Sequence, residues 1–361
     1  MKQPSTRTLT LGAAAIILVM LIFFAAQCRS EEEEGSRWAV DPIWDDGQAE
    51  ISAYQAVAIR YGKPRQYTDY QIVVKEPFSK RLLVKADPDH DPEDVITVLK
   101  LNRILNYQTG VYAYHQMLSF FFDVEDMQPL KWTLAHFEWC GNTFKMFTRR
   151  ERQVRLETHT YWDGDADQVF DLEFDSSTVF YDQLMVWLRA QQFEPGTSRT
   201  LRVYPTQLSS RGPRPEEVQA TLTVPGLEEI TLAGGNRRKA LLVQVGMADG
   251  LHRFWLEPEF PRRLLGWDTP NGERGRLQWS KRLPYWKLNQ PGDESYLDPP
   301  PAGPAENSSD VPEPEIESSV EEDEPGIEDL SGVETPLPLE QPGPDVSEVS
   351  EPSRPVELDE P

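Results

Sequence analysis

Three side chains that can carry chemistry lie close together on one predicted strand. His136, Glu138 and Cys140 occupy alternating positions of the segment HFEWC. Because successive side chains of a strand point to opposite faces, these three are expected to share one face. An imidazole, a carboxylate and a thiol in a row could bind a metal ion or activate a thiolate. Side chains on one strand point in parallel, however, so a buried cysteine and a His–Glu contact within a sheet are the simpler interpretation.

A second polar cluster resembles the start of a calcium-binding loop. Asp163, Asp165 and Asp167 alternate within a short segment that also contains Gly164. The EF-hand pattern needs a glycine at its sixth position and a bidentate glutamate at its twelfth. This chain has Gln168 and Phe174 at those positions. A tight hairpin therefore explains the cluster more simply than a calcium site.

The remaining candidates are single residues. His115 lies in an aromatic stretch and could act as a base in a pocket, but a hydrogen-bonded histidine at a sheet edge is the simpler interpretation. Four tryptophans could line a ligand cavity, although tryptophans more often belong to a core: these are Trp255, Trp267, Trp279 and Trp286. The chain contains no G-x-S-x-G, Walker, G-x-G-x-x-G or H-E-x-x-H motif. We therefore predict no cofactor, and an enzyme is the alternative rather than the leading interpretation.

The elements that position these residues are predicted to be mostly strands, because apolar and β-branched runs alternate with turn clusters. The predicted strands are Tyr70–Val74, Arg81–Val84, Val95–Leu101, Val111–Phe122, Leu130–Cys140, Thr143–Arg149, Val154–Tyr161, Val169–Phe174, Thr200–Tyr204, Gln219–Val224, Ala240–Val245, Arg253–Leu256 and Arg276–Ser280. One main helix is predicted near residues 177–192, where apolar residues recur at helical spacing before Pro195 and Gly196.

This pattern predicts a mainly β fold, a β-rich member of the α+β class. Many strands without βαβ alternation favour an antiparallel sheet. A folded region of residues 48–296 is large for one sandwich, so we expect a large curved antiparallel sheet or half-barrel around the helix. The loop Ser209–Pro215 could divide this region into two subdomains. By analogy of fold, such architectures in the cell envelope often belong to carriers or scaffolds.

The N-terminus is predicted to be a targeting segment. Lys2 and Arg7 precede an uncharged apolar run from Leu9 to Ala26. A basic start before such a run is typical of a signal peptide or a short membrane anchor. The acidic residues Glu31–Glu34 follow the run, and this polarity places the rest of the chain outside the cytoplasm.

Cys28 directly follows the apolar run, as the lipidated cysteine does in a bacterial lipoprotein signal. Residues 1–28 are therefore predicted to be a signal or membrane anchor, and residues 29–47 an acidic tether. Gln27 occupies a position where a small residue is usual. An uncleaved anchor and simple secretion consequently stay open as alternatives to lipidation at Cys28.

The acidity of the chain is concentrated at the C-terminus. The 361 residues contain 60 acidic and 36 basic side chains, for a net charge of −24. Residues 297–361 hold 20 of the acids, one arginine, 14 of the 31 prolines and no aromatic residue. This composition predicts a disordered acidic tail. The excess of acidic over basic side chains excludes a general nucleic-acid binder, which needs a basic surface. A chain with two cysteines is also not a disulfide scaffold.

Several short segments resemble an uncharacterised family of bacterial envelope lipoproteins, best known from gram-negative lineages such as the Bacteroidetes. The segments are Asp46–Ile51, Arg60–Gly62, Val84–Asp87, Leu99–Asn102, Asn106–Tyr114 and Glu138–Asn142, and the resemblance covers roughly residues 46–290. Members often carry the label "septum formation inhibitor Maf". True Maf proteins are nucleotide pyrophosphatases with an N-terminal Ser-Pro-Arg motif, which this sequence lacks. The resemblance implies an envelope location and Cys28 as the lipidated residue, and it brings no activity.

We therefore expect an envelope-anchored binding or scaffold protein of a bacterium that faces the periplasm. Its expected partners are the membrane, through the N-terminal anchor, and a protein or a lipid, but not nucleic acid. The first alternative is an envelope hydrolase that uses the face of His136, Glu138 and Cys140. The second alternative is a lipid-binding carrier.

Overall fold

The computed structural model describes residues 38–150 and 153–300. The apolar run Leu9–Ala26, Cys28 and the acidic tail from residue 301 onward lie outside these residues. No helix among the described residues is long and apolar enough to cross a bilayer.

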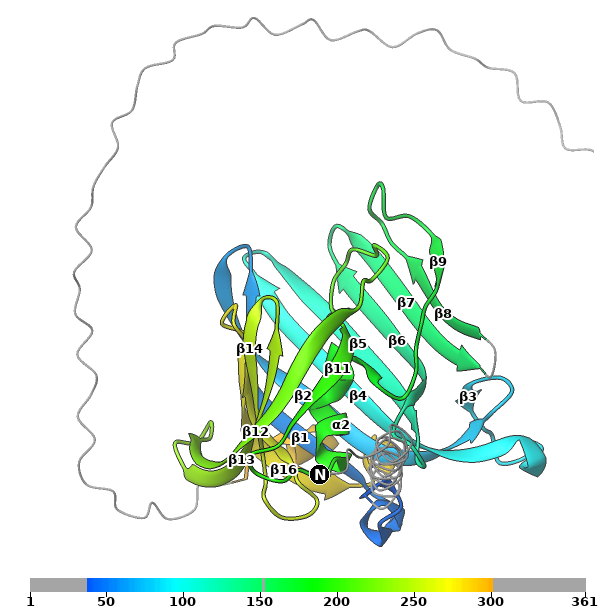
Figure 1. The fold of residues 1–361 in the computed structure, drawn as a ribbon. Coiled ribbons are helices and arrows are strands. Elements are labelled where there is room, and N and C mark those ends of the chain that lie inside the picture. Colours follow the sequence, from blue (N-terminus) through cyan, green and yellow to red (C-terminus); the bar gives the residue numbers. More distant parts are fainter. Residues whose placement is uncertain (1–37, 151–152, 301–361) are drawn as a thin grey trace, which may run out of the picture. The chain divides into compact units, whose positions relative to one another are not determined.

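A single 16-stranded sheet forms most of the described chain (Figure 1). Its order is β10-β11-β12-β13-β14-β15-β16-β1-β2-β4-β5-β6-β7-β8-β9, with β3 paired to β2 off this path. Neighbouring strands are antiparallel except β10 and β11, which are parallel. The strands are β1 (Ala49–Arg60), β2 (Lys63–Ser79), β3 (Val84–Lys85), β4 (Val95–Thr109), β5 (Tyr112–Asp123), β6 (Pro129–Glu138), β7 (Gly141–Arg150), β8 (Gln153–His159), β9 (Gln168–Asp171), β10 (Thr178–Phe180), β11 (Ser198–Tyr204), β12 (Val218–Thr231), β13 (Arg237–Met247), β14 (Gly250–Leu256), β15 (Leu264–Asp268) and β16 (Arg274–Leu283).

The main helical segment packs against the concave face of this sheet. The 3₁₀ turn η3 (Tyr181–Gln183) leads into α2 (Leu184–Ala190), and every residue of both is buried. Four further 3₁₀ turns are short: η1 (Pro42–Asp45), η2 (Pro92–Asp94), η4 (Tyr285–Lys287) and η5 (Asp293–Leu297). The predicted mainly β fold, with a large open antiparallel sheet and one main helix, is confirmed.

The core lies between the helical segment and the curled sheet. Phe180, just before η3, has its ring within 5.5 Å of rings from β6, β7 and β11, namely Trp132, Phe147 and Tyr204. Strands far apart in the sheet order therefore meet around one side chain. Along β4 and β5 every second residue is buried for most of their length, as a strand with one face on a core requires.

Three local predictions differ from the structure. The helix begins later than residue 177 because the β-branched Thr178 and Val179 pair with β11 as β10. The predicted strand Arg81–Val84 is mostly a turn, because Leu83 adopts a left-handed backbone conformation with φ of 55° and donates its N–H to Ser79. Strands β1 and β15 were not predicted.

The folded domain begins before residue 48, within the segment assigned to the acidic tether. Trp38 and Trp44 are both buried. The Trp44 Nε1 donates to the carbonyl of Trp38, and the Trp38 Nε1 donates to the carbonyl of Pro261. Large aromatic side chains bury much apolar area, so these two tryptophans hold residues 38–47 against the domain.

The loop that connects β11 to β12 crosses the inner face of β7 and β8, and we call residues 205–217 the strap. The side chains of Thr143, Lys145 and Thr158 donate hydrogen bonds to strap carbonyls. The loop Ser209–Pro215, which could have divided two subdomains, lies within the strap. It joins neighbouring strands of the same sheet, so the sheet continues across it.

Candidate binding site

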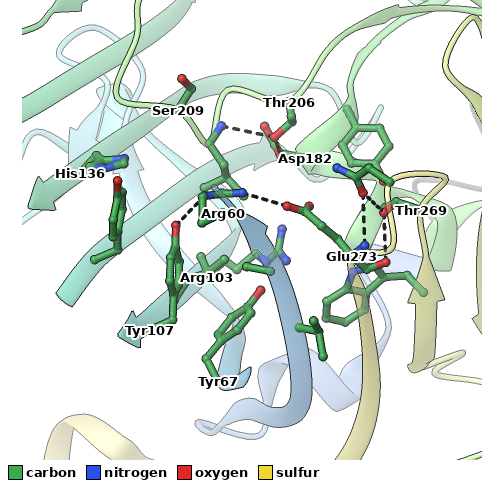
Figure 2. Close-up of a pocket in the computed structure, with 18 of the residues that line it drawn as sticks. Arg60, Tyr67, Arg103, Tyr107, His136, Asp182, Thr206, Ser209, Thr269 and Glu273 are labelled. Atoms are coloured by element: carbon green, nitrogen blue, oxygen red, sulfur yellow. Dashed lines mark hydrogen bonds and ion pairs between the residues drawn. The ribbon is translucent and has the colours of Figure 1, made fainter. Parts of the chain in front are cut away.

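A cavity of about 340 Å³ opens at the end of the sheet that carries the β1–β2, β4–β5 and β6–β7 turns. These long hairpins extend beyond the short helical segment, which fills only part of the concave face. Tyr181, Asp182 and Met185 from the helical segment form one wall of the cavity. Strands β1, β2, β4, β5, β6 and β15, the strap, and the β15–β16 turn supply the rest (Figure 2).

A buried ion pair lies at the base of this cavity. The Arg103 Nε donates to Asp69 Oδ2 over 2.7 Å, and neither side chain is more than 5% exposed. The guanidinium also lies 5.3 Å from the centre of the Trp267 ring. Burial raises the pKa of Asp69, and Arg103 opposes this shift. Arg103 also lines the cavity, so its guanidinium borders this space as well as Asp69.

A second arginine reaches the cavity from the end of β1. The Arg60 Nε donates to the Tyr107 hydroxyl over 2.8 Å, and Nη1 donates to Glu273 over 2.9 Å. Figure 2 shows Arg60, Arg103 and the Tyr67 hydroxyl directed toward the same part of the cavity. The Tyr67 ring packs against Tyr107, with the two ring centres 5.6 Å apart.

His136 lines the same cavity from the end of β6 and is 2% exposed. The Gln116 side-chain amide lies 2.8 Å from its Nδ1, and Glu138 Oε1 lies 3.8 Å from its Nε2. A neighbouring carboxylate favours the tautomer that carries the proton on Nε2. Burial lowers the pKa of His136 to about 4, and the charges of Arg60 and Lys145 add to the shift. The ring is therefore neutral at neutral pH, with a buried Nε2–H that makes no hydrogen bond.

Two of the three residues in the predicted row come together. His136 and Glu138 point inward beside Tyr114, whose ring is 5.3 Å from the imidazole. Cys140 is exposed in the β6–β7 turn, because β6 ends at Glu138 and the chain reverses at Trp139 and Cys140. The expected shared face therefore ends at Glu138, and the thiol is not part of the cavity wall.

The other predicted candidates lie apart from the cavity. His115 is exposed, and its Nδ1 lies 3.0 Å from Asn106 Oδ1. Asp163 lies in the loop between β8 and β9, where Asp165 pairs with Arg211 and Asp167 pairs with His159. Within residues 38–150 and 153–300, no group of three or more His, Cys, Asp or Glu side chains could hold a metal ion.

Of the four tryptophans considered as cavity residues, only Trp267 belongs to the wall described above. Trp255 and Trp279 are buried in the core, and Trp286 is 46% exposed.

Sequence reasoning missed Arg60, Tyr67, Arg103, Tyr107 and Glu273. Arg103 lies just beyond the predicted strand Val95–Leu101, but it leaves a signal because it alternates in phase with Leu101 and Leu105. A charged residue at such an inward position needs a buried partner.

No family model matches the chain, and no curated protein matches it. The chain is similar in structure to a β-barrel-like protein of the domain of unknown function DUF1849 from Brucella abortus. The sequence identity is 9% and the TM-score is 0.40, over 65% of this chain and 98% of that one.

Proposed function

We propose that this chain is an envelope-anchored, periplasm-facing binding protein that holds a small molecule in the cavity. The observation that carries the proposal is the buried Nε2–H of His136, which makes no hydrogen bond among the described residues, on a cavity wall that also includes Arg103 and Tyr67. A buried donor left unpaired costs about 1–3 kcal/mol. A molecule that accepts a hydrogen bond from this N–H would recover that free energy. The volume of about 340 Å³ lies within the range of small-molecule sites.

The wall also indicates the chemistry of the ligand. Asp69 and Glu273 already balance the charges of Arg103 and Arg60, so the site is not strongly cationic. The aromatic rings of the wall offer flat apolar faces. We therefore infer a ligand with an acceptor-rich polar group, such as a carboxylate or several carbonyl or hydroxyl oxygens, joined to a flat or cyclic body.

The alternatives fit the wall less well. A lipid carrier needs an apolar cavity, whereas Arg60, Arg103 and Glu273 line this one. A hydrolase could use His136 and Glu138, but an imidazole with a pKa of about 4 is a weak base at neutral pH. Cys140 is exposed and is not part of the cavity wall. Binding requires none of these groups to react.

The envelope location is part of the proposal and is supported by the sequence, through Lys2, Arg7 and the apolar run that follows them. Replacing Cys28 by Ala tests whether the protein is anchored by a lipid on Cys28. If Cys28 carries the lipid, the Cys28→Ala variant is not processed as a lipoprotein and keeps its apolar run. Intact-mass analysis of the membrane fraction then shows a lipidated mature form in the parent protein only. Recovery of the parent protein from the cytoplasm would contradict the location.

Native mass spectrometry of the full chain, purified in mild detergent, tests the binding function. We expect a bound molecule that dissociates on unfolding. The Tyr67→Phe variant should bind it about 10-fold more weakly, as expected for the loss of one hydrogen bond to the ligand. Tyr285→Phe is a matched control, because Tyr285 is half-buried and lies outside the cavity wall. An empty protein that no small polar ligand stabilises against heat would contradict the proposal.

A further inference from the structure

Four turns at one end of the sheet each expose a large apolar side chain. Tyr61 follows β1, Val111 follows β4, Trp139 follows β6 and Tyr161 follows β8. Their exposed fractions are 68%, 80%, 76% and 61% respectively. The strands that carry them, β1 to β9 apart from β3, are consecutive in the sheet, so these turns follow one another along its end. We call these four side chains the apolar rim.

Direct contacts join the rim into one surface. The Tyr61 hydroxyl lies 2.7 Å from that of Tyr112, and the Tyr112 ring lies 6.3 Å from Trp139. Tyr161 packs so closely on Gly141 that a Cβ at this glycine would overlap its ring.

The surface continues onto the outward face of the adjoining strands. Met117 and Phe144 lie on either side of Ala135 across the sheet, and both are partly exposed, as is Phe137. A contiguous exposed apolar surface, unlike scattered apolar residues, indicates an interaction site.

The rim adjoins the mouth of the cavity. The Tyr61 hydroxyl also lies 2.9 Å from that of Tyr114, which lines the cavity. Arg60, the residue before Tyr61, lines it too. Whatever covers the rim therefore lies beside the route into the cavity.

We propose that the apolar rim inserts into the interfacial region of a lipid bilayer and places the cavity mouth against the membrane surface. Tryptophan and tyrosine are the residues enriched at this depth of a bilayer. The exposed parts of the four side chains amount to roughly 500 Å², given side-chain areas of about 150–250 Å². A stable protein–protein interface buries about 800 Å² per partner. The four side chains alone fall short of that area, and because they lie on separate turns each can enter a bilayer separately.

The charge distribution specifies the kind of bilayer. The segments 108–116 and 139–144 form the two central turns and contain no Asp, Glu, Lys or Arg. The turn that carries Tyr61 is followed by Lys63 and Arg65, and clustered basic residues attract anionic lipids. The uncharged central turns can enter a neutral bilayer, and anionic lipid should strengthen the contact at the Tyr61 turn. Asp163 lies beyond Tyr161 and limits the inserted surface on that side.

The rim can reach the membrane that holds the proposed N-terminal anchor. The 11 residues between Ala26 and Trp38 span at most about 40 Å when fully extended. The length of the 12-residue β1 is also about 40 Å. A tilted domain therefore brings the rim to the same bilayer.

Cys140 provides a reporter within the rim, because it is exposed and adjacent to Trp139. In a Cys28→Ser background it is the sole thiol of the full chain, which retains its apolar N-terminal run. An environment-sensitive fluorophore is attached to Cys140, and the protein is reconstituted in phosphatidylcholine vesicles that contain a spin-labelled phosphatidylcholine as quencher. The matched control carries the fluorophore at Leu82→Cys with Cys140→Ser, because Leu82 is exposed at the opposite end of β2.

We expect several-fold stronger quenching at residue 140 than at residue 82 in phosphatidylcholine vesicles, and no loss of this difference when anionic lipid is added. The double variant V111Q/W139Q should reduce quenching at residue 140 to the level of the control. Equal quenching at both positions would overturn the proposal. In a parallel sample, the unlabelled Cys28→Ser protein is tested for disulfide cross-linking between two copies through Cys140. Quenching that appears only at protein densities where this cross-linking occurs would overturn the proposal in favour of self-association. Because Tyr67→Phe leaves the rim intact, quenching in that variant should match the parent protein. A failure of membrane insertion can therefore be distinguished from a failure of ligand binding.

Discussion

The guanidinium of Arg189 in α2 forms a bidentate ion pair with the carboxylate of Glu50 in β1, over 2.7 and 3.0 Å, and both side chains are 4% exposed. The guanidinium also lies over the rings of Trp38 and Trp44. One side chain thus connects the helix, the first strand and the segment that precedes it.

Arg189→Ala should therefore destabilise the domain strongly. The variant leaves the Glu50 carboxylate buried without its partner, which costs about 3–5 kcal/mol. Urea denaturation measures this loss. In the double variant R189M/E50L the buried charge is also removed, so most of the stability should return. If R189A and R189M/E50L are equally unstable, the charge is not the cause.

The strap is held to the helical segment by Asp182. Its Oδ1 accepts from the Thr206 hydroxyl and its Oδ2 accepts from the Gln207 N–H, both over 2.7 Å. Asp182→Ala leaves the buried N–H unpaired, so we expect a loss of about 2 kcal/mol and faster tryptic cleavage at Arg211. Thr206→Val removes only one of the two bonds and should have the smaller effect on both measurements. Equal cleavage rates in all three proteins would contradict this prediction.

Gly275 in β16 lies against the indole ring of Trp267. A Cβ at this position would overlap the ring, so Gly275→Ala should displace Trp267 from the cavity wall. We expect a destabilisation of about 3 kcal/mol, as for an overpacked core, together with weaker ligand binding. Gly246→Ala is the matched control within a strand, because its Cβ would lie at an ordinary 3.7 Å from the nearest atom. Thermal unfolding of the two variants distinguishes a local clash from a general effect of glycine replacement.

His136 should make the stability of the domain depend on pH. Its folded-state pKa of about 4 lies below the usual value of 6.5. Between these values the unfolded chain binds a proton that the folded chain does not, so this residue makes stability fall as pH falls. The contribution approaches about 1.4 kcal/mol per pH unit for one proton. His136→Gln should remove it, which denaturation of both proteins at pH 4.5, 5.5 and 7 will measure. Parallel profiles for the two proteins would show that His136 is not responsible.

The fold was largely predictable because strand alternation is a local property of the sequence. The run Val95–Leu101 is rich in β-branched and apolar residues and lies within β4. Strand β1 was missed because Ala49, Ala53, Ala56 and Ala58 are buried but have low strand propensity. Of these, Ala58 lines the cavity, where its small side chain leaves room that no local pattern reveals.

The cavity was much less predictable than the sheet. Arg103 and Asp69 come from adjacent strands, and they meet because the β2–β4 register places Asp69 opposite Leu105. Register depends on pairing across many residues and is not readable from one strand. His136 and Glu138 could be proposed because they are neighbours in sequence. The inward direction of that face, and the exposure of Cys140, depend on where the β6–β7 turn begins.

The pairing of β16 with β1 places Ala49 opposite Leu283 and joins the two halves of the sheet. During synthesis from the N-terminus, the edge of β1 that faces β16 therefore stays unpaired until almost the whole domain has been made. Pairings this distant in sequence form slowly, and an open strand edge invites association with other chains. Until β16 has been synthesised, the unfinished domain therefore presents an open strand edge with which other chains can pair.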